Sequence, residues 1–227
     1  MRNTVIFDMD GVLVNSQPLH FEVDLATLRT AGVAATLADV EHCVGLSTPD
    51  SWAHYRRKFN LRQSVDELRA AHDARLLPMF RAAELQPVAG IPALLALLKD
   101  RGVKTAVASS SSWDLIHLIL GKLQIAEFFD ALVSGEDLPH SKPAPDIFLR
   151  AAAAVQSEPA ACAVIEDAAT GVLAAKRAAM FCVAYRNPTS GKQDLSLADW
   201  RIDTFDAINQ NLDWLQRESL ELKVESN

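Results

Sequence analysis

Short apolar runs recur along most of the chain, and each is bounded by polar or turn-forming residues. They are rich in valine, isoleucine, alanine and phenylalanine, and they are too short for ordinary helices. Runs of this kind predict strands that are buried on both faces of a sheet. The five runs are Val5–Phe7, Thr105–Ser109, Ala131–Ser134, Ala161–Glu166 and Phe181–Tyr185.

Helical patterns separate the later runs. The first of these patterns ends in basic residues followed by Gly102, which is a typical helix end. Strands that alternate with helices at this spacing predict a parallel sheet with helices on both faces. The expected fold class is therefore α/β, with a Rossmann-like parallel core. The four patterns are Ile91–Arg101, Trp113–Leu123, Pro145–Val155 and Ala169–Ala179.

Residues 16–83 break this alternation, because four helical stretches follow one another without a strand between them. We expect residues 1–15 and 84–227 to form the α/β core domain and residues 16–83 to form a small inserted helical cap domain. An insertion after the first strand lies over the carboxyl ends of the strands, where ligands bind in open α/β sheets, and can act as a lid. The stretches are Pro18–Ala31, Leu37–Cys43, Pro49–Phe59 and Ser64–Ala83.

Composition narrows the class of protein. The 227 residues carry a net charge of −7 without a basic cluster, which disfavours nucleic-acid binding. Three cysteines at unrelated spacings, Cys43, Cys162 and Cys182, favour a reducing compartment over a disulfide framework. Neither a signal-peptide pattern nor an apolar run of membrane-spanning length is present. We expect a cytoplasmic monomer that has no membrane or nucleic-acid partner.

The first run leads into Asp8-Met9-Asp10-Gly11. A turn rich in aspartate and glycine is one interpretation. The other is chemical: one carboxylate can attack phosphorus, while the second protonates the leaving oxygen and later deprotonates a water. Alternate residues of an extended chain share a face, so both side chains could point to one substrate. Two carboxylates in one site then need unequal environments.

Polar groups also follow three later strands. Ser109 and Ser110 precede a helix, where an N-cap role competes with binding of a phosphate. Lys142 is either a solvated surface charge or, between stiffening prolines, a rigidly mounted partner for a phosphoryl group. Glu166 and Asp167 are either acidic N-cap residues or part of an oxygen-rich site that suits Mg²⁺.

The order and strand-end placement of these motifs resemble the haloacid dehalogenase superfamily over essentially the whole chain. DMDGV, Ser109, Lys142 in SKPAPD and Glu166-Asp167 in VIEDAATG match its four motifs. The resemblance is closest to the subgroup of β-phosphoglucomutase and sugar-phosphate phosphatases, which carries a small helical cap. Dehalogenating relatives lack an aspartate at the position of Asp10, so dehalogenation is disfavoured.

The resemblance implies a role for each motif residue. Asp8 is the expected nucleophile and Asp10 the general acid and base, while Ser109 and Lys142 hold the transferring phosphoryl group. The implied cofactor is Mg²⁺, with Asp8, the Asp10 carbonyl and Asp167 as ligands and Glu166 close by. The expected substrate-binding residues are Gly11, His20, Gly45, Ser47, Thr48 and Ser110.

The cap distinguishes between two activities. The mutase of this family has an arginine where this chain has Thr48, and its later cap lysine is missing near Leu77. Arg56, Arg57 or Lys58 could replace these charges, although a basic run on a helix is usually a solvated face.

We therefore expect an Mg²⁺-dependent phosphatase that acts on a small phosphorylated metabolite, a sugar or polyol phosphate, through an aspartyl-phosphate. The alternatives are a phosphohexomutase of the β-phosphoglucomutase type and a non-catalytic phosphate-sensing or protein-binding module.

Overall fold

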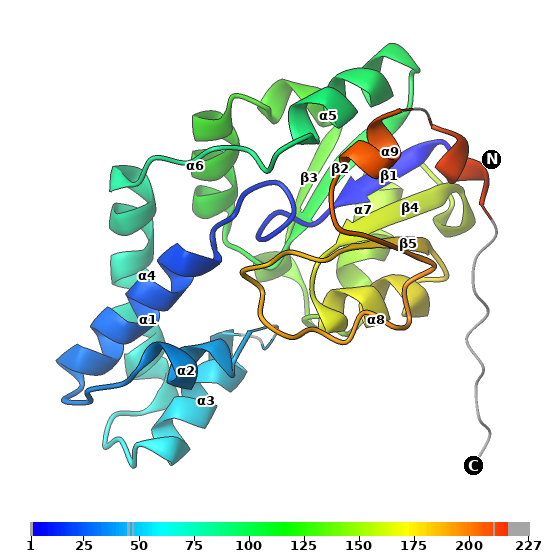
Figure 1. Cartoon of the computed structure of the whole chain (residues 1–227). Coiled ribbons are helices and arrows are strands. Elements are labelled where there is room, and N and C mark those ends of the chain that lie inside the picture. The colour runs from blue at the N-terminus through cyan, green and yellow to red at the C-terminus, as the bar shows by residue number, and fades with distance from the viewer. Residues whose placement is uncertain (1, 45, 47, 211, 218–227) are drawn as a thin grey trace, which may run out of the picture.

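A computed structural model describes residues 2–44, 46, 48–210 and 212–217, and its centre is a parallel sheet. Six strands lie in the order β3-β2-β1-β4-β5-β6, and all neighbours are parallel (Figure 1). The α/β fold class predicted from the sequence is confirmed. The strands are β1 (Thr4–Phe7), β2 (Lys104–Ser109), β3 (Ala131–Ser134), β4 (Cys162–Glu166), β5 (Phe181–Tyr185) and β6 (Trp200–Ile202).

The edge strand β6 was not predicted. Its three residues alternate between partly buried Trp200, exposed Arg201 and buried Ile202. It pairs with β5, and exposed Arg201 interrupts the continuous apolar run that marks the other strands.

Helices cover both faces of the sheet, as the alternating pattern predicts. Val5 and Phe7 of β1 join a buried cluster with α5 and α6, whereas Ile6 joins a second cluster with α7 and α8. This division follows from the strand period of two, which sends neighbouring side chains to opposite faces. The helices are α5 (Ile91–Asp100), α6 (Trp113–Leu123), α7 (Asp146–Ala154), α8 (Ala169–Arg177) and the short α9 (Asp206–Asn209).

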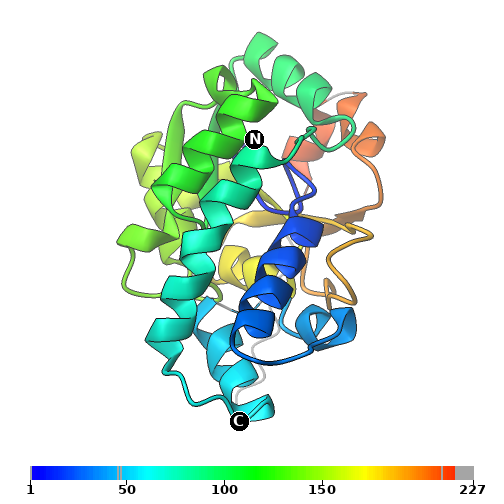
Figure 2. The same ribbon diagram turned by 90° about the vertical axis from the view of Figure 1, so that its left-hand side faces the viewer.

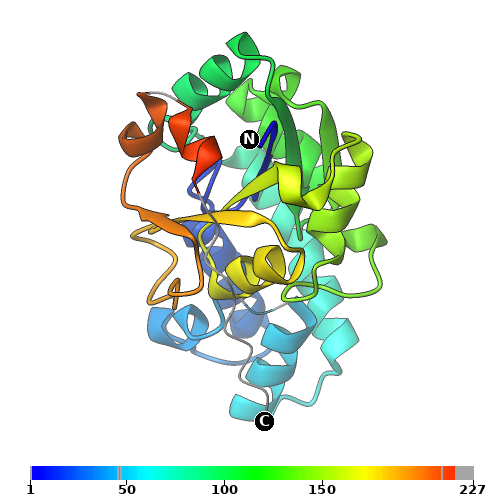
Figure 3. The same ribbon diagram turned by 90° about the vertical axis from the view of Figure 1, so that its right-hand side faces the viewer.

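The segment expected as a cap consists of four helices that extend from one end of the sheet (Figure 3). They share a separate apolar cluster centred on Trp52 and Tyr55, both fully buried. Helices α1 and α4 run side by side (Figure 2). No strand of the sheet comes from the described residues of this segment. The helices are α1 (Gln17–Thr30), α2 (Leu37–Glu41), α3 (Thr48–Lys58) and α4 (Val65–Ala82).

Two chain segments connect these helices to the sheet, and they lie next to each other. Val14 forms an isolated antiparallel bridge with Pro87, and the Val88 amide donates to the Leu13 carbonyl at 2.9 Å. The chain therefore enters and leaves the four-helix segment at one place. Among the described residues, no helix combines the length and the apolar character that crossing a membrane requires.

Candidate active site

The centre of the candidate site is an acidic cluster where two adjacent central strands end. Phe7 of β1 lies opposite Ile165 of β4, and the Asp8 amide donates to the Ile165 carbonyl at 2.9 Å. This register brings Asp8 beside Glu166 and Asp167. One oxygen of each of the three carboxylates lies within 4.8 Å of the others, and all three residues are buried. The structure thus brings these three predicted site residues together at the strand ends.

Two glycines leave the space that the acidic side chains occupy. Gly11 has a φ of +84°, and a Cβ atom there would lie 2.0 Å from Oδ2 of Asp167. A Cβ atom on Gly171 would lie 1.6 Å from Oε1 of Glu166. Gly171 was not predicted as a site residue. A glycine within a helical pattern is an indication of close contact, but the sequence does not tell which group makes that contact.

Lys142 connects two members of the acidic cluster. Its Nζ atom lies 2.5 Å from Oδ1 of Asp8 and 2.7 Å from Oε1 of Glu166, and its side chain is only 9% exposed. The other oxygen of Glu166 accepts hydrogen bonds from the amides of Asp167 at 2.7 Å and Ala168 at 2.8 Å. Lys142 is thus a buried partner of the cluster and not a solvated surface charge.

The electrostatics of the cluster fit a divalent cation. Burial raises the pKa of Asp8, Lys142 opposes the shift, and Glu166 and Asp10 add to it. Burial and the charges of Glu166 and Asp8 likewise raise the pKa of Asp167. Three carboxylates therefore face one lysine in a buried space, and a hard cation with oxygen ligands would relieve their repulsion. The donor set suits Mg²⁺, with Asp8 and Asp167 as the available carboxylates.

Asp10 has a different environment from Asp8. Its Oδ1 atom accepts hydrogen bonds from Ser16 Oγ at 2.6 Å and His20 Nε2 at 3.1 Å, and its Oδ2 atom accepts one from Ser111 Oγ at 2.9 Å. Burial raises the pKa of Asp10, but these donors outweigh burial and lower the pKa to about 2. The two aspartates therefore have unequal environments, although in this arrangement Asp10 is the more readily ionised of the two.

The four consecutive serines at residues 109–112 make different contacts. Ser109 is buried, and its Oγ accepts the amide of Ser111 at 3.1 Å, while Ser110 is exposed. Ser112 is the N-cap residue of α6 but makes no side-chain cap bond. Ser111 is the serine that reaches Asp10, and the sequence did not single it out. Only the path of the loop distinguishes these four neighbours.

The structure describes some, but not all, of the residues expected to bind substrate. His20 contacts Asp10 and lies against the ring of Phe80, with 5.0 Å between ring centroids. Thr48 is the exposed first residue of α3. Gly45 and Ser47 lie outside the described residues, so their expected role stays a prediction.

Two basic side chains of the four-helix segment, which could have bound a substrate phosphate, bond to other groups of that segment. Nε of Arg56 donates to the Gln63 carbonyl at 2.9 Å, and Nζ of Lys58 pairs with Asp39 at 2.7 Å.

The loop after β5 also reaches the site. The sequence places residues 187–194 after the fifth strand and beside the site edge, but it does not assign them a role. Nδ2 of Asn187 donates to the Gly11 carbonyl at 2.8 Å, and the Ser190 hydroxyl donates to Oδ2 of Asp167. Both residues are buried. Their polar character is typical of any surface loop, so pattern alone does not identify them.

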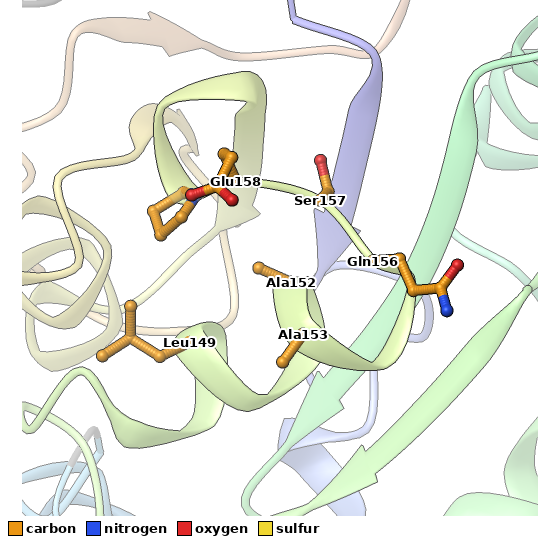
Figure 4. Close-up of a pocket in the computed structure, with 7 residues that line it drawn as sticks. Leu149, Ala152, Ala153, Gln156, Ser157 and Glu158 are labelled. Atoms are coloured by element: carbon orange, nitrogen blue, oxygen red, sulfur yellow. The ribbon is translucent and has the colours of Figure 1, made fainter.

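A surface hollow of about 420 Å³ lies away from this cluster, beside the carboxyl end of α7 (Figure 4). Its lining continues into the segment that leads to the amino end of β4, opposite the strand ends that hold the carboxylates. Its lining contains one ionisable side chain, Glu158, and none of the predicted site residues.

Comparison with known proteins agrees with this geometry. A model of the family described as haloacid dehalogenase-like hydrolases matches residues 5–185. Hexitol phosphatase B of Escherichia coli (strain K12) is 33% identical over 189 residues, which cover 81% of this chain and 83% of that protein. Beta-phosphoglucomutase of Bacillus subtilis (strain 168) is 33% identical over 187 residues, covering 79% of this chain and 81% of that one.

A solved structure shows the same fold. The crystal structure of CbbY from Rhodobacter sphaeroides in complex with phosphate superposes with a TM-score of 0.84. The match covers 96% of this chain and all of that one at 23% sequence identity.

Proposed function

Because the chain belongs to the haloacid dehalogenase-like hydrolase family, we propose that it is an Mg²⁺-dependent phosphatase of small phosphomonoesters, with Asp8 as the nucleophile. The observation that carries this proposal is the pairing of Asp8 with Lys142 at 2.5 Å, beside Asp167. A carboxylate held against a buried ammonium group is placed to receive a phosphoryl group, because the lysine also offsets the repulsion between the two anions.

The proposed reaction has two steps. An oxygen of Asp8 attacks phosphorus, the bond from phosphorus to the substrate oxygen breaks, and Asp10 gives a proton to that leaving oxygen. Asp10 then takes a proton from a water molecule, and the water oxygen attacks phosphorus. The bond from phosphorus to Asp8 breaks, which regenerates the Asp8 carboxylate and releases inorganic phosphate. Bound Mg²⁺, held by Asp8, Asp167 and the Asp10 carbonyl, would neutralise charge on the phosphoryl oxygens.

Asp10 has to change partners during this cycle. In the structure it accepts hydrogen bonds from Ser16, His20 and Ser111, which favour its ionised form. A general acid needs a proton and contact with the leaving oxygen. Ser16 is the N-cap residue of α1 and His20 lies in the first turn of that helix, so we propose that motion of α1 releases Asp10 toward the substrate.

That motion agrees with the expected domain division, which we retain as a proposal. Residues 16–83 would form the cap domain, and hinges would lie near residues 15–16 and 84–88. The bridge between Val14 and Pro87 supports this proposal, because adjacent connections allow the four helices to turn as one body. Crystals grown with and without a phosphate analogue would test it, and an unchanged orientation of α1–α4 would count against it.

The proposed substrates are sugar or polyol monophosphates. Relatives at 33% identity include a protein named hexitol phosphatase and one named beta-phosphoglucomutase. A mutase must grip the second phosphate of a sugar bisphosphate, for which a forked arginine is well suited. Here Thr48 replaces the arginine, and Arg56 and Lys58 already bond to Gln63 and Asp39. These features favour hydrolysis.

The beta-phosphoglucomutase relative keeps mutase activity as the second candidate, and the relatives named hexitol phosphatase and beta-phosphoglucomutase favour an enzyme over a non-catalytic module.

The test is a phosphate-release screen over hexitol, hexose and pentose monophosphates with Mg²⁺, using Asp8→Asn as the blank. We expect release from at least one polyol or sugar phosphate. A parallel reaction with β-glucose 1-phosphate and catalytic glucose 1,6-bisphosphate follows glucose 6-phosphate and free phosphate together. Faster formation of glucose 6-phosphate than of free phosphate would replace the phosphatase proposal with the mutase.

A further inference from the structure

The loop between β5 and β6 contains two polar residues that are more buried than a surface loop requires. Asn187 is 5% exposed and Ser190 is 2% exposed. The loop, gold to orange in Figure 1, leaves the end of β5 at the edge of the sheet that carries the acidic cluster. Buried polar groups are normally hydrogen-bonded, and both residues direct their bonds toward the candidate site.

Ser190 bonds directly to a carboxylate of the acidic cluster. Its hydroxyl donates to Oδ2 of Asp167. The same oxygen faces Gly11, where a Cβ atom would lie only 2.0 Å away. Asp167 is therefore confined on one side by the turn at Gly11 and held by a directed hydrogen bond. The other oxygen of Asp167, Oδ1, is restrained by fewer contacts.

The position of Ser190 is itself fixed by a second side chain. Nε2 of Gln193 donates to the Ser190 carbonyl at 3.0 Å, and Oε1 of Gln193 accepts the Ala169 amide at 3.0 Å. Ala169 begins α8, two residues after Asp167. Gln193 thus connects the loop to the helix that follows Asp167. Ser190 and Asp167 are therefore held in fixed positions relative to each other.

Asn187 ties the other end of the loop to the turn after Asp8. Its Nδ2 donates to the Gly11 carbonyl at 2.8 Å, while its Oδ1 accepts the Thr189 amide at 2.8 Å. Both ends of the Asn187 amide are thus used. The loop therefore contacts the two chain segments that supply the proposed metal ligands, the turn after β1 and the residue after β4.

We propose that Ser190 is a positioning residue for Asp167 and that it sets the affinity of the site for Mg²⁺. This inference rests on the metal site of the proposed function. A hydroxyl that holds one carboxylate oxygen restricts rotation of the ligand and leaves the second oxygen to the cation. Hydrogen-bond partners of metal ligands commonly change metal affinity by about 10–100-fold when they are removed.

The experiment measures Mg²⁺ binding to the full chain by isothermal titration calorimetry, without substrate. We expect Ser190→Ala to raise the Kd for Mg²⁺ by about tenfold or more, while Ser190→Thr, which keeps a hydroxyl, recovers part of the affinity. Ser196→Ala is the matched control, because Ser196 is an exposed serine of the same loop and should leave the Kd unchanged.

A second variant covers the case in which Ser190→Ala fails to fold. Gln193→Ala removes the hydrogen bonds that hold the Ser190 backbone in place but leaves the Ser190 hydroxyl and Asp167 unchanged. It should also raise the Kd for Mg²⁺. Far-UV circular dichroism and thermal denaturation report on folding. A purely structural loop would lower the melting temperature but leave the Kd of the folded variants unchanged.

The outcomes separate the inference from the function on which it rests. Wild-type protein that binds no Mg²⁺ would overturn the metal site and the role of Ser190 together. Wild-type protein that binds Mg²⁺, with folded Ser190→Ala or Gln193→Ala of equal affinity, would overturn the role of Ser190 alone. A raised Kd in the folded variants, with an unchanged Kd for Ser196→Ala, supports it.

Discussion

Lys142 places its ammonium nitrogen 2.5 Å from Oδ1 of Asp8, although 134 positions separate the two residues in the sequence. Both side chains are at most one-tenth exposed. A buried ion pair of this kind is not by itself evidence of stability, because desolvation opposes the Coulomb attraction. Its position at the carboxyl ends of two central strands instead agrees with the proposed role of Lys142 beside the nucleophile.

Replacing Asp8 tests the nucleophile. We expect Asp8→Asn to lower phosphate release by about a thousandfold or more, because an amide cannot form the aspartyl-phosphate. The fold should persist, since Lys142 keeps its partner Glu166. Phosphate release and circular dichroism measure the two effects. Asp100→Asn, at the exposed end of α5, is the control. A folded Asp8→Asn protein that keeps a tenth of the activity would refute the assignment.

Metal removal tests the acidic cluster. Excess chelator should abolish phosphate release, and added Mg²⁺ should restore it. Ca²⁺ should restore little, because its larger and looser coordination shell would displace the phosphate from Asp8. Titrating each cation into chelator-treated protein while following phosphate release gives the comparison. Undiminished activity in excess chelator would contradict a metal role for Asp167.

Two glycine substitutions test the close packing beneath the site. Gly171→Ala, in α8, should destabilise the fold by about 1–3 kcal/mol and lower activity, because its Cβ atom would displace Glu166 from Lys142. Gly121→Ala, in α6, meets no atom within 4 Å and should stabilise the fold by about 0.5–1 kcal/mol. Urea unfolding measures both. Stabilisation by both substitutions would show that Glu166 is free to move.

The pH dependence of stability should change when Asp24 is replaced. Tyr55 donates to Asp24 Oδ2 at 3.0 Å, and His72 Nε2 lies 3.5 Å from Oδ1. Burial nevertheless raises the pKa of Asp24 above its ordinary value of 3.8, against the opposing effects of His72 and Tyr55. The folded state then binds more protons than the unfolded state between the two pKa values, so this group's contribution to stability falls as pH rises.

Asp24→Asn removes that titration. The free energy of unfolding of the wild type, minus that of the variant, should therefore be larger near pH 4 than near pH 7. Urea unfolding at several pH values provides the measurement, with Asp100→Asn as the exposed control. A difference that is constant with pH, or that grows toward pH 7, would be evidence against the raised pKa.

The amino-acid sequence determined that the sheet is parallel, five of its six strands and the order of the chemical groups along the chain. Runs such as Val5–Phe7 and Phe181–Tyr185 identified central strands because these strands are buried on both faces and need continuous apolar segments. The polar residues after them, Asp8 and Asp167, could be expected to meet because the carboxyl ends of parallel strands share one edge. Local composition was sufficient for both conclusions.

Tertiary structure decided which neighbouring side chains complete the site. Ser111 and not Ser110 reaches Asp10, Gly171 accommodates Glu166, and Ser190 bonds to Asp167. Ser111 and Asp10 lie 101 positions apart and Ser190 and Asp167 lie 23 apart, whereas Gly171 meets Glu166 across the turn from β4 into α8. Each contact depends on strand register or on the path of a loop. A serine or glycine has the same local pattern whether or not a carboxylate lies beside it, so only the folded arrangement distinguishes these residues.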